Sequence, residues 1–221
     1  MTGPQPSAAI RALSLAEQTY AIVRRRIVEG GIAPGAPLRQ DAIALELGVS
    51  KIPLREALSR LAQDGLLSLV PHRGYAVRPL SATEAAEIFA LRLALEPAAC
   101  ADGSLKAGAA ARTAAAATLD ALEAIDGADP HGRAVTMNRE FHLALLQPAG
   151  PLTVQLLERL HVLAERYVRV HLEPQGRRDR ARAEHRELLA AWQAGAAPAV
   201  ERLVAAHIRR TRDELLAELA G

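Results

Sequence analysis

Hydrophobic and polar positions repeat with a helical period over most of this 221-residue chain. Within residues 38–60, two short amphipathic segments flank a junction at Gly48-Val49-Ser50. Gly48 can take the left-handed conformation that ends a helix, and Ser50 can cap the start of the next one. The second segment repeats an apolar stripe at i, i+4 and i+7, formed by Leu54, Leu58 and Leu61. This pattern predicts a helix-turn-helix.

Each of the two helices is expected to bury an apolar face, and the second is expected to expose a basic one. In the first, the expected inward side chains are Leu38, Ala42, Leu45 and, as a further candidate, Ile43. In the second, the side away from the leucines is basic and carries Lys51, Ile52, Arg55 and Ser59. A recognition helix needs an apolar back, and Lys or Arg near its N-terminus to reach phosphates and base edges. A helical hairpin with a solvated basic face has the same spacing, so the flanking segments must decide.

The flanking segments complete a winged-helix pattern. Ser14 to Glu17 has capping-box spacing, so a helix should begin there and run to about Glu29, before the Gly30-Gly31 break. Two β-prone runs, residues 66–70 and 75–78, surround a turn and predict a hairpin tipped by His72 and Arg73. The alternative is a small sheet that only closes the domain. Three helices followed by a basic hairpin favour a winged helix over residues 14–78, preceded by a flexible tail over residues 1–13.

Charge is unevenly distributed along the chain. Residues 1–78 hold ten Lys and Arg against six acids, which gives +4, whereas the remainder holds seventeen against nineteen, which gives −2. A basic front supports a nucleic-acid surface there, and 3% aromatic residues argue against a single-strand binder that stacks bases. The single cysteine, the lack of a long apolar run and the absence of a leader pattern predict a cytoplasmic protein with no membrane span.

Residues 15–78 resemble the N-terminal domain of the GntR family of bacterial transcription regulators. The most specific part of the match is the run GVSKIPLREAL, residues 48–58. The resemblance implies that Lys51, Ile52 and Arg55 meet bases and phosphates and that Gly74 lies at the wing tip. The further candidate DNA contacts are Arg39, Ser59, His72 and Arg73. Many members have Arg in place of Lys51 and Thr in place of Ile52, so the operator sequence should differ, because lysine is a point donor and isoleucine offers only apolar contact.

After a boundary at Pro79-Leu80-Ser81, the pattern is wholly helical and predicts an antiparallel helical bundle over residues 79–221. The expected helices cover residues 82–102, 106–126, 131–147, 150–172, 178–194 and 197–219. The first of these is expected to break at Gly103.

Three of the seven histidines lie on apolar stripes of three different helices, namely His142, His185 and His207. Burying three imidazoles is costly unless something binds them, and neutral imidazole is the commonest metal ligand in proteins. Asn138, one turn before His142, could add a weak oxygen ligand and leave coordination positions open. The alternative is a set of ordinary core histidines, because their convergence cannot be seen in a sequence.

The other candidates have plainer expectations. His131, His161 and His171 are expected at the surface or at an interface, and Arg92 and Glu96 are expected to form a surface ion pair. Arg166 and Arg169 lie in a helix rich in Leu and Val, where one of them could project into a cavity.

Residues 81–219 resemble the FCD-type ligand-binding domain of the FadR subfamily of GntR regulators. The matching pieces are Arg92…Glu96, Asn138-Arg139-Glu140-Phe141-His142, Glu184-His185…Leu188 and His207. The resemblance implies a divalent metal (Zn, Ni or Mn) on Asn138, His142, His185 and His207. It also implies a homodimer and a small carboxylate effector that pairs with Arg92. Because of their place in the Leu- and Val-rich helix, Arg166 and Arg169 are further effector candidates. The family usually has Asp where this chain has Asn138, and the neutral amide is a weaker metal ligand. Because the substitution leaves one more positive charge at the site, it should favour an anionic effector.

Together these features predict a ligand-responsive transcription regulator, by family default a repressor, that binds a pseudo-palindromic double-stranded operator as a homodimer. Effector binding at the histidines would shift the bundle helices, so that the paired winged helices no longer span both half-sites. The competing hypothesis is a metal-dependent hydrolytic enzyme with a DNA-binding appendage. It lacks a well-placed general base, because Glu140 and Glu184 fall beside the inward stripes and Asn138 cannot serve, so no enzyme is predicted. A third hypothesis is an architectural or protein-binding module.

Overall fold

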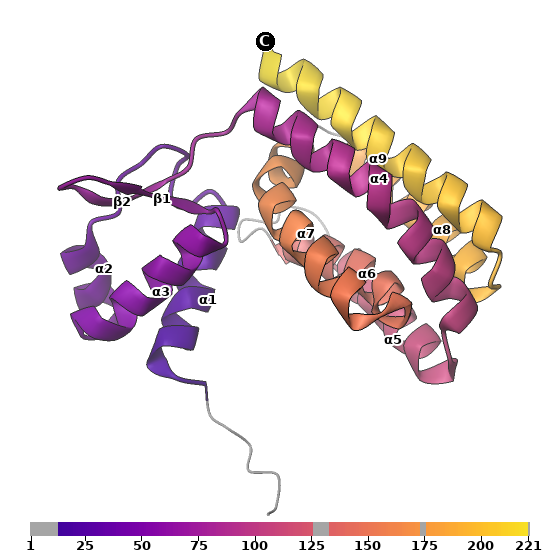
Figure 1. Cartoon of the computed structure of the whole chain (residues 1–221), viewed down its shortest axis with the longest axis horizontal. Coiled ribbons are helices and arrows are strands. Elements are labelled where there is room, and N and C mark those ends of the chain that lie inside the picture. The colour runs from indigo at the N-terminus through magenta and orange to yellow at the C-terminus, as the bar shows by residue number, and fades with distance from the viewer. Residues whose placement is uncertain (1–12, 126–132, 173–175, 221) are drawn as a thin grey trace, which may run out of the picture.

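A computed structural model describes residues 13–125, 133–172 and 176–220. The expected tail, up to residue 12, and the expected helix start at His131 lie outside these ranges. The described residues form two parts, a winged-helix part (residues 13–78) and a helical bundle (residues 82–220), as Figure 1 shows. Each part has its own main hydrophobic core, and the cores meet where Val28 packs into that of the bundle and Val162 against that of the winged-helix part. The predicted fold class, mainly α with a winged helix-turn-helix and a helical bundle, is confirmed.

The winged-helix part begins with a capped helix, as the spacing predicts. Its elements are α1 (Leu15–Val28), α2 (Gln40–Leu47), α3 (Lys51–Gln63), β1 (Leu67–Val70) and β2 (Gly74–Val77). The backbone N–H of Glu17 donates to Ser14 Oγ at 3.1 Å, and the Glu17 carboxylate accepts the Ser14 N–H at 2.7 Å. The two strands are antiparallel, with Leu67 opposite Val77, and Pro37 forms an isolated bridge to Ala76. Gly48 ends α2 with φ 63° and ψ 32°.

The buried face of α2 differs from the expected one. Ile43 and Ala44 are buried, whereas Leu45 is 85% exposed and Ala42 is exposed as well. The prediction was wrong because it started the helical period at Leu38, which is buried but precedes the first helical residue, Gln40. A residue outside a helix cannot set the phase of its apolar stripe.

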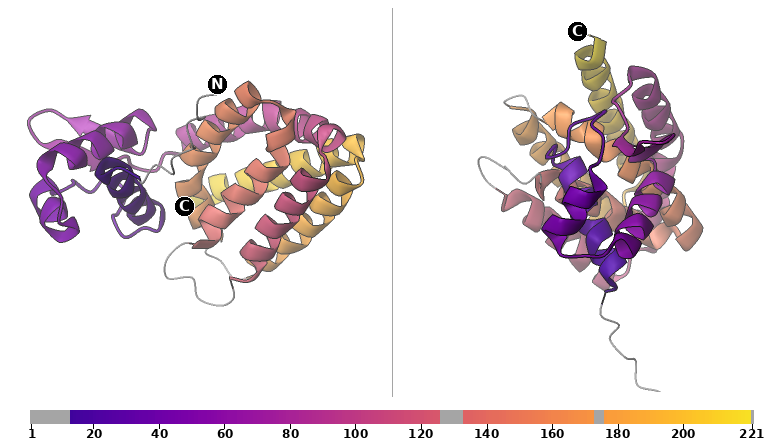
Figure 2. Two further views of the ribbon diagram at one scale, coloured as in Figure 1. Left: turned by 90° about the horizontal axis from the view of Figure 1, so that it is seen from below. Right: turned by 90° about the vertical axis from the view of Figure 1, so that its left-hand side faces the viewer.

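The helical bundle consists of six α-helices and one 3₁₀ turn among the described residues. These are α4 (Ala82–Lys106), α5 (Ala109–Glu123), α6 (Arg133–Leu146), η1 (Gln147–Ala149), α7 (Pro151–Leu172), α8 (Arg177–Gln193) and α9 (Ala197–Ala220). The long helices α4 and α9 lie side by side, and α8 packs on α9. Helices α6 and α7 pack on α4, and α5 packs on α6 (Figures 1 and 2). No helix in the described ranges is long and apolar enough to span a bilayer.

Gly103 does not break α4 as predicted, because the helix continues to Lys106. A Cβ added at Gly103 would lie 2.6 Å from the carbonyl oxygen of Leu145, so the missing side chain lets α4 approach the end of α6. The same carbonyl accepts the indole N–H of Trp192 at 3.1 Å. Glycine is therefore required here by close packing within a helix, and local sequence rules assign such a residue to a helix end.

Helix α7 makes the contact between the two parts. Glu165 on α7 is 2% exposed and accepts hydrogen bonds from Arg24 of α1 and, at 2.9 Å, from Arg139 of α6. Arg159 donates to the carbonyl of Gln63 at the end of α3, at 3.0 Å. One buried carboxylate thus links the winged-helix part to the helix that carries Asn138 and His142.

Candidate functional site

The outer face of α3 carries the predicted DNA contacts. Lys51, Ile52 and Arg55 are exposed and Ser59 is half-buried, while Leu54 and Leu58 behind them are fully buried. Ile52 is 71% exposed, so its apolar side chain is open to contact with a bound molecule. Lys51 forms an exposed ion pair with Asp41 at 2.8 Å, a weak interaction that a phosphate could replace.

A groove of about 560 Å³ runs along this face. It is lined by Ile52, Arg55, Glu56, Ser59, Arg60, Gln63 and, from the wing, Tyr75. The hairpin therefore stands beside the recognition helix, as the sequence order predicts.

The wing turn exposes His72 and Arg73, and Gly74 opens β2 with φ 83°. A Cβ on Gly74 would lie 2.7 Å from Gln40 Nε2, so the wing packs closely on the start of α2. Arg39 is exposed immediately before Gln40. The candidate DNA contacts therefore gather on one side of the winged-helix part.

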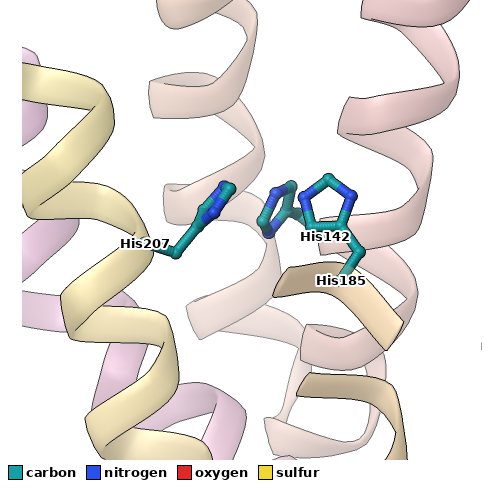
Figure 3. Close-up of side chains that lie close together, drawn as sticks. All are labelled: His142, His185 and His207. Atoms are coloured by element: carbon teal, nitrogen blue, oxygen red, sulfur yellow. The ribbon is translucent and has the colours of Figure 1, made fainter. Parts of the chain in front are cut away.

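Three histidines from three helices meet inside the bundle (Figure 3). His142 comes from α6, His185 from α8 and His207 from α9, and one nitrogen of each lies within 4.8 Å of the other two. The ring centroids are 4.9 to 5.3 Å apart. Nitrogens bound to one zinc ion lie roughly 3 to 4 Å apart, as bond lengths near 2 Å require, so the rings would need to move only slightly inward.

Two histidines of the cluster, His142 and His185, favour the neutral imidazole, which is the form that binds metals. Burial, followed by the neighbouring His185, lowers the pKa of His142 well below its usual value, although Glu96 opposes the shift. Burial and His207 likewise lower the pKa of His185. Within the described part of the chain, no hydrogen-bond partner is found for either ring nitrogen of His185 or for Nδ1 of His142. Buried, unpaired and neutral nitrogens fit a metal ion.

Asn138 lies between two small cavities beside the histidines. One, of about 20 Å³, is lined by Asn138, His142 and His207 together with Arg92 and His171. The other, of about 30 Å³, is lined by Asn138, His185 and apolar residues that include Leu122 and Leu172. Each volume holds one or two water-sized molecules. The half-buried Asn138 therefore lines both cavities beside the three histidines, and its role as a metal ligand stays a prediction.

Arg92 and Glu96 are not the surface ion pair expected from their spacing. Arg92 is 4% exposed and Glu96 fully buried, and the guanidinium donates to the carboxylate through Nε at 2.8 Å and Nη2 at 3.2 Å. Glu96 Oε1 also lies 3.2 Å from His161 Nε2 and 3.6 Å from His142 Nδ1. The spacing is the same for an exposed and a buried pair, so only the packing of α4 into the bundle distinguishes them.

His161 and His171 were predicted at the surface or an interface, and both are buried, at 3% and 5% exposure. His161 faces Glu96, and His171 lines the smaller cavity with its Nδ1 3.8 Å from Glu214. These polar partners come from helices distant in sequence, so the faces of the two residues could not be assigned from their own helix.

Arg166 and Arg169 do not reach the histidines. Arg166 donates to the carbonyl of Arg78 and lies 3.5 Å from Glu84, at the connection between the two parts. A Cβ added at Gly30 would touch the Arg169 guanidinium at 3.0 Å, so Arg169 lies against the end of α1. Val168 and His171 occupy the inner face of α7, and the arginines point elsewhere because residues turn by roughly 100° per step. Arg92 alone of the three predicted effector arginines lines the cavity.

Glu184 is a residue of the site that the sequence pattern placed beside the inward stripe. Its Oε2 lies 2.7 Å from His207 Nδ1, and its other oxygen accepts from Arg210. Burial works to raise the pKa of Glu184, but His207, Arg210 and Arg180 together lower it. Its position immediately before His185 was the available signal.

Comparison with known proteins follows the same division of the chain. Residues 15–77 match the family described as bacterial regulatory proteins, gntR family, and residues 87–210 match the FCD domain, which covers more than half of the chain. The chain belongs to the GntR family. This GntR protein is 32% identical over 209 residues to the HTH-type transcriptional regulator BphR of Paraburkholderia xenovorans, a match that covers 90% of this chain and 82% of BphR.

Other GntR relatives match in part or in fold alone. The HTH-type transcriptional repressor RspR of Escherichia coli is 39% identical over 80 residues, and the chain spans only 35% of its length. The solved structure of E. coli McbR/YncC superposes with a TM-score of 0.81 at 24% identity, covering 95% of this chain and all of that one. At that identity the likeness shows the shared fold.

Proposed function

We propose that this GntR protein is a ligand-responsive repressor that binds a pseudo-palindromic operator through α3 and the wing. In this proposal it senses a small carboxylate at a divalent metal in the bundle. The observation that carries the sensor half is the convergence of three buried histidines from three helices, with nitrogens within 4.8 Å. Repression is proposed because RspR is named a repressor.

The residues that would hold the metal are His142, His185 and His207, with the Asn138 amide oxygen as a weak fourth ligand. When bound, the metal would supply a Lewis-acidic centre with open positions for a carboxylate. Arg92 could meet the same carboxylate, although its pairing with Glu96 means that it has one guanidinium edge already engaged. Cavities of about 20 and 30 Å³ are too small for most organic acids, so an effector would have to displace side chains. Such a displacement is what a switch needs.

A homodimer is supported by exposed leucines on two helices that pack together. Leu91 and Leu95 follow one another at i, i+4 on α4, and Leu152 and Leu156 do so on α7, with exposures between 39% and 78%. Apolar side chains grouped on neighbouring helices favour a protein interface, and a two-fold dimer matches paired half-sites. Leu152→Glu with Leu156→Glu should convert the dimer to monomers in sedimentation equilibrium, and an unchanged mass would contradict this interface.

A regulator accounts for the site better than a hydrolase. Of the carboxylates near the histidines, Glu96 is bound by Arg92 and Glu184 by His207 and Arg210. Both carboxylates are thus already engaged by charged or hydrogen-bonding partners, which makes each a poor general base.

The DNA half can be tested with duplexes selected from a random-sequence library. Arg55→Ala should weaken binding to the selected duplex by roughly 5- to 150-fold, the equivalent of 1–3 kcal/mol for one base-reading arginine. Arg209→Ala removes the same charge from an exposed position on α9 and should bind as the parent does. Equal loss in both variants would reduce the interaction to general charge attraction and refute the recognition-helix assignment.

The sensor half can be tested by thermal unfolding with zinc, nickel or manganese, each with and without a panel of small organic acids. A bound metal raises the melting temperature by mass action, and an acid that completes its coordination should raise it further only when the metal is present. The His142→Ala variant should lose both increments. No increment from any metal in the parent protein would refute the metal site.

A further inference from the structure

Glu184 sits directly outside the histidine cluster, on the outer side of His207. Its Oε2 is 2.7 Å from His207 Nδ1, within hydrogen-bond distance. The carboxylate is itself held in place, because Arg210 donates to Oε1 and Arg180 Nε lies 4.0 Å from the same oxygen. The Glu184 carboxylate is thus a fixed acceptor for one particular ring nitrogen.

The three histidines differ in what orients them. Nδ1 of His142 is 3.6 Å from Glu96, which is too long for a hydrogen bond, and within the described ranges His185 has no partner on either nitrogen. Those two rings are packed at 1% exposure, whereas the His207 side chain is 12% exposed. The least buried ring is therefore the one that a carboxylate holds.

We propose that Glu184 is a positioning residue for the metal. By accepting the Nδ1–H of His207 it fixes the tautomer in which Nε2 carries no proton, so that Nε2 is the nitrogen available to the cluster. A neutral imidazole binds a metal through its unprotonated nitrogen, and carboxylates that hold the other N–H commonly orient metal-binding histidines. Figure 3 shows the His207 ring directed toward His142 and His185. This inference rests on the proposed metal site.

The surroundings of His207 supply a matched control. A cleft of about 150 Å³ between α8 and α9 is lined by Glu184, Glu187 and His207, and His207 also lines the inner cavity. Glu187 is exposed, and among the described residues no ion pair or hydrogen bond is found for it. Glu184 and Glu187 carry the same charge into the same cleft, but only Glu184 touches the ring. A pair of variants can therefore separate orientation from charge.

The test is a zinc titration of the full chain, stripped of metal, in competition with a chromophoric chelator. Glu184→Ala should bind zinc 10- to 100-fold more weakly, the range typical for such partners. Glu184→Gln keeps an acceptor oxygen and should lose less, and Glu187→Gln should stay within about twofold of the parent. Parent-like affinity in Glu184→Ala would overturn the proposal, as would equal losses in the two glutamine variants.

The tautomer gives a second readout that needs no metal. Long-range ¹H–¹⁵N correlation spectra of the metal-free protein should show His207 protonated at Nδ1, and Glu184→Ala should move the proton to Nε2 in much of the population. An unchanged tautomer would overturn the positioning role. If Glu184→Ala does not fold, Glu184→Gln carries the zinc titration, in which it should lose more affinity than Glu187→Gln, and the tautomer is read in the parent protein alone. A parent protein that binds no zinc would refute the metal site instead, while the tautomer spectra would still decide the role of Glu184.

Discussion

Replacing Glu96 by glutamine should strongly destabilise the helical bundle. Glu96 is fully buried, and it is paired with Arg92, which is only 4% exposed. Burial by itself would raise the pKa of Glu96, but Arg92 and His161 hold it well below its usual range, so the carboxyl is ionised at neutral pH. Glutamine has nearly the same size. The substitution therefore removes the charge and leaves the packing, and the Arg92 guanidinium remains buried without its counter-charge.

Removing one partner of a buried ion pair costs about 3–5 kcal/mol, because the other charge is left uncompensated. Domains are stable by about 5–15 kcal/mol in total, so this single change should remove about a fifth of the stability or more. Replacing both Arg92 and Glu96 by methionine leaves no buried charge without a partner. The double variant should therefore be more stable than Glu96→Gln alone.

The assay can use the single tryptophan of the chain. Trp192 is fully buried in α8 and donates its indole N–H to the Leu145 carbonyl at 3.1 Å, so its fluorescence reports unfolding of the helical bundle. Urea titrations of the metal-free protein at pH 7 give the free energy of unfolding. A loss under about 1 kcal/mol, which is ordinary for a surface change, would refute the claim that Glu96 is an ionised, structural partner of Arg92.

Three further changes test other contacts. Burial, followed by Arg177, lowers the pKa of His171 from 6.5 to about 4. Between pH 6.5 and about 4, the His171 side chain is therefore protonated in the unfolded chain but not in the folded one. Its contribution to stability is present above pH 6.5 and is lost as the pH falls toward 4. His171→Gln should flatten that decline by up to about 1.4 kcal/mol per pH unit. Gly103→Ala should destabilise by about 1–3 kcal/mol, because its Cβ would press on a backbone carbonyl. A double-mutant cycle of Arg24→Gln with Glu165→Gln should show a coupling of about 0.5–3 kcal/mol in unfolding.

For each of these three predictions, one experimental result would contradict it. An unchanged pH slope in His171→Gln would show that the ring titrates alike in both states. Parent-like stability in Gly103→Ala would mean that α4 can move away from the end of α6. Additive effects of Arg24→Gln and Glu165→Gln would show that the charged contact between the two parts is not formed in solution.

The helices, the wing and the three inward histidines could be predicted from local patterns. Caps such as Ser14 and the left-handed Gly48 act within a few residues, so their effect is visible in a short stretch of sequence. The errors had two causes, a close contact with a distant helix and a wrongly placed helix start. Gly103 continues a helix because α6 passes close to it, and Leu45 is exposed because the helix begins later than the apolar pattern suggests.

The positions of most helices, and the inward direction of His142, His185 and His207, follow from the local sequence, because a helical period assigns each side chain to a face. What those faces meet depends on the packing of the whole chain. This packing brought the histidines together, buried Arg92 with Glu96, set Glu184 against His207 and turned Arg166 toward the connection between the two parts. The physical reason is that burial and ion pairing depend on how separate helices rotate and pack against one another, and residue spacing within one helix carries no information on its neighbours.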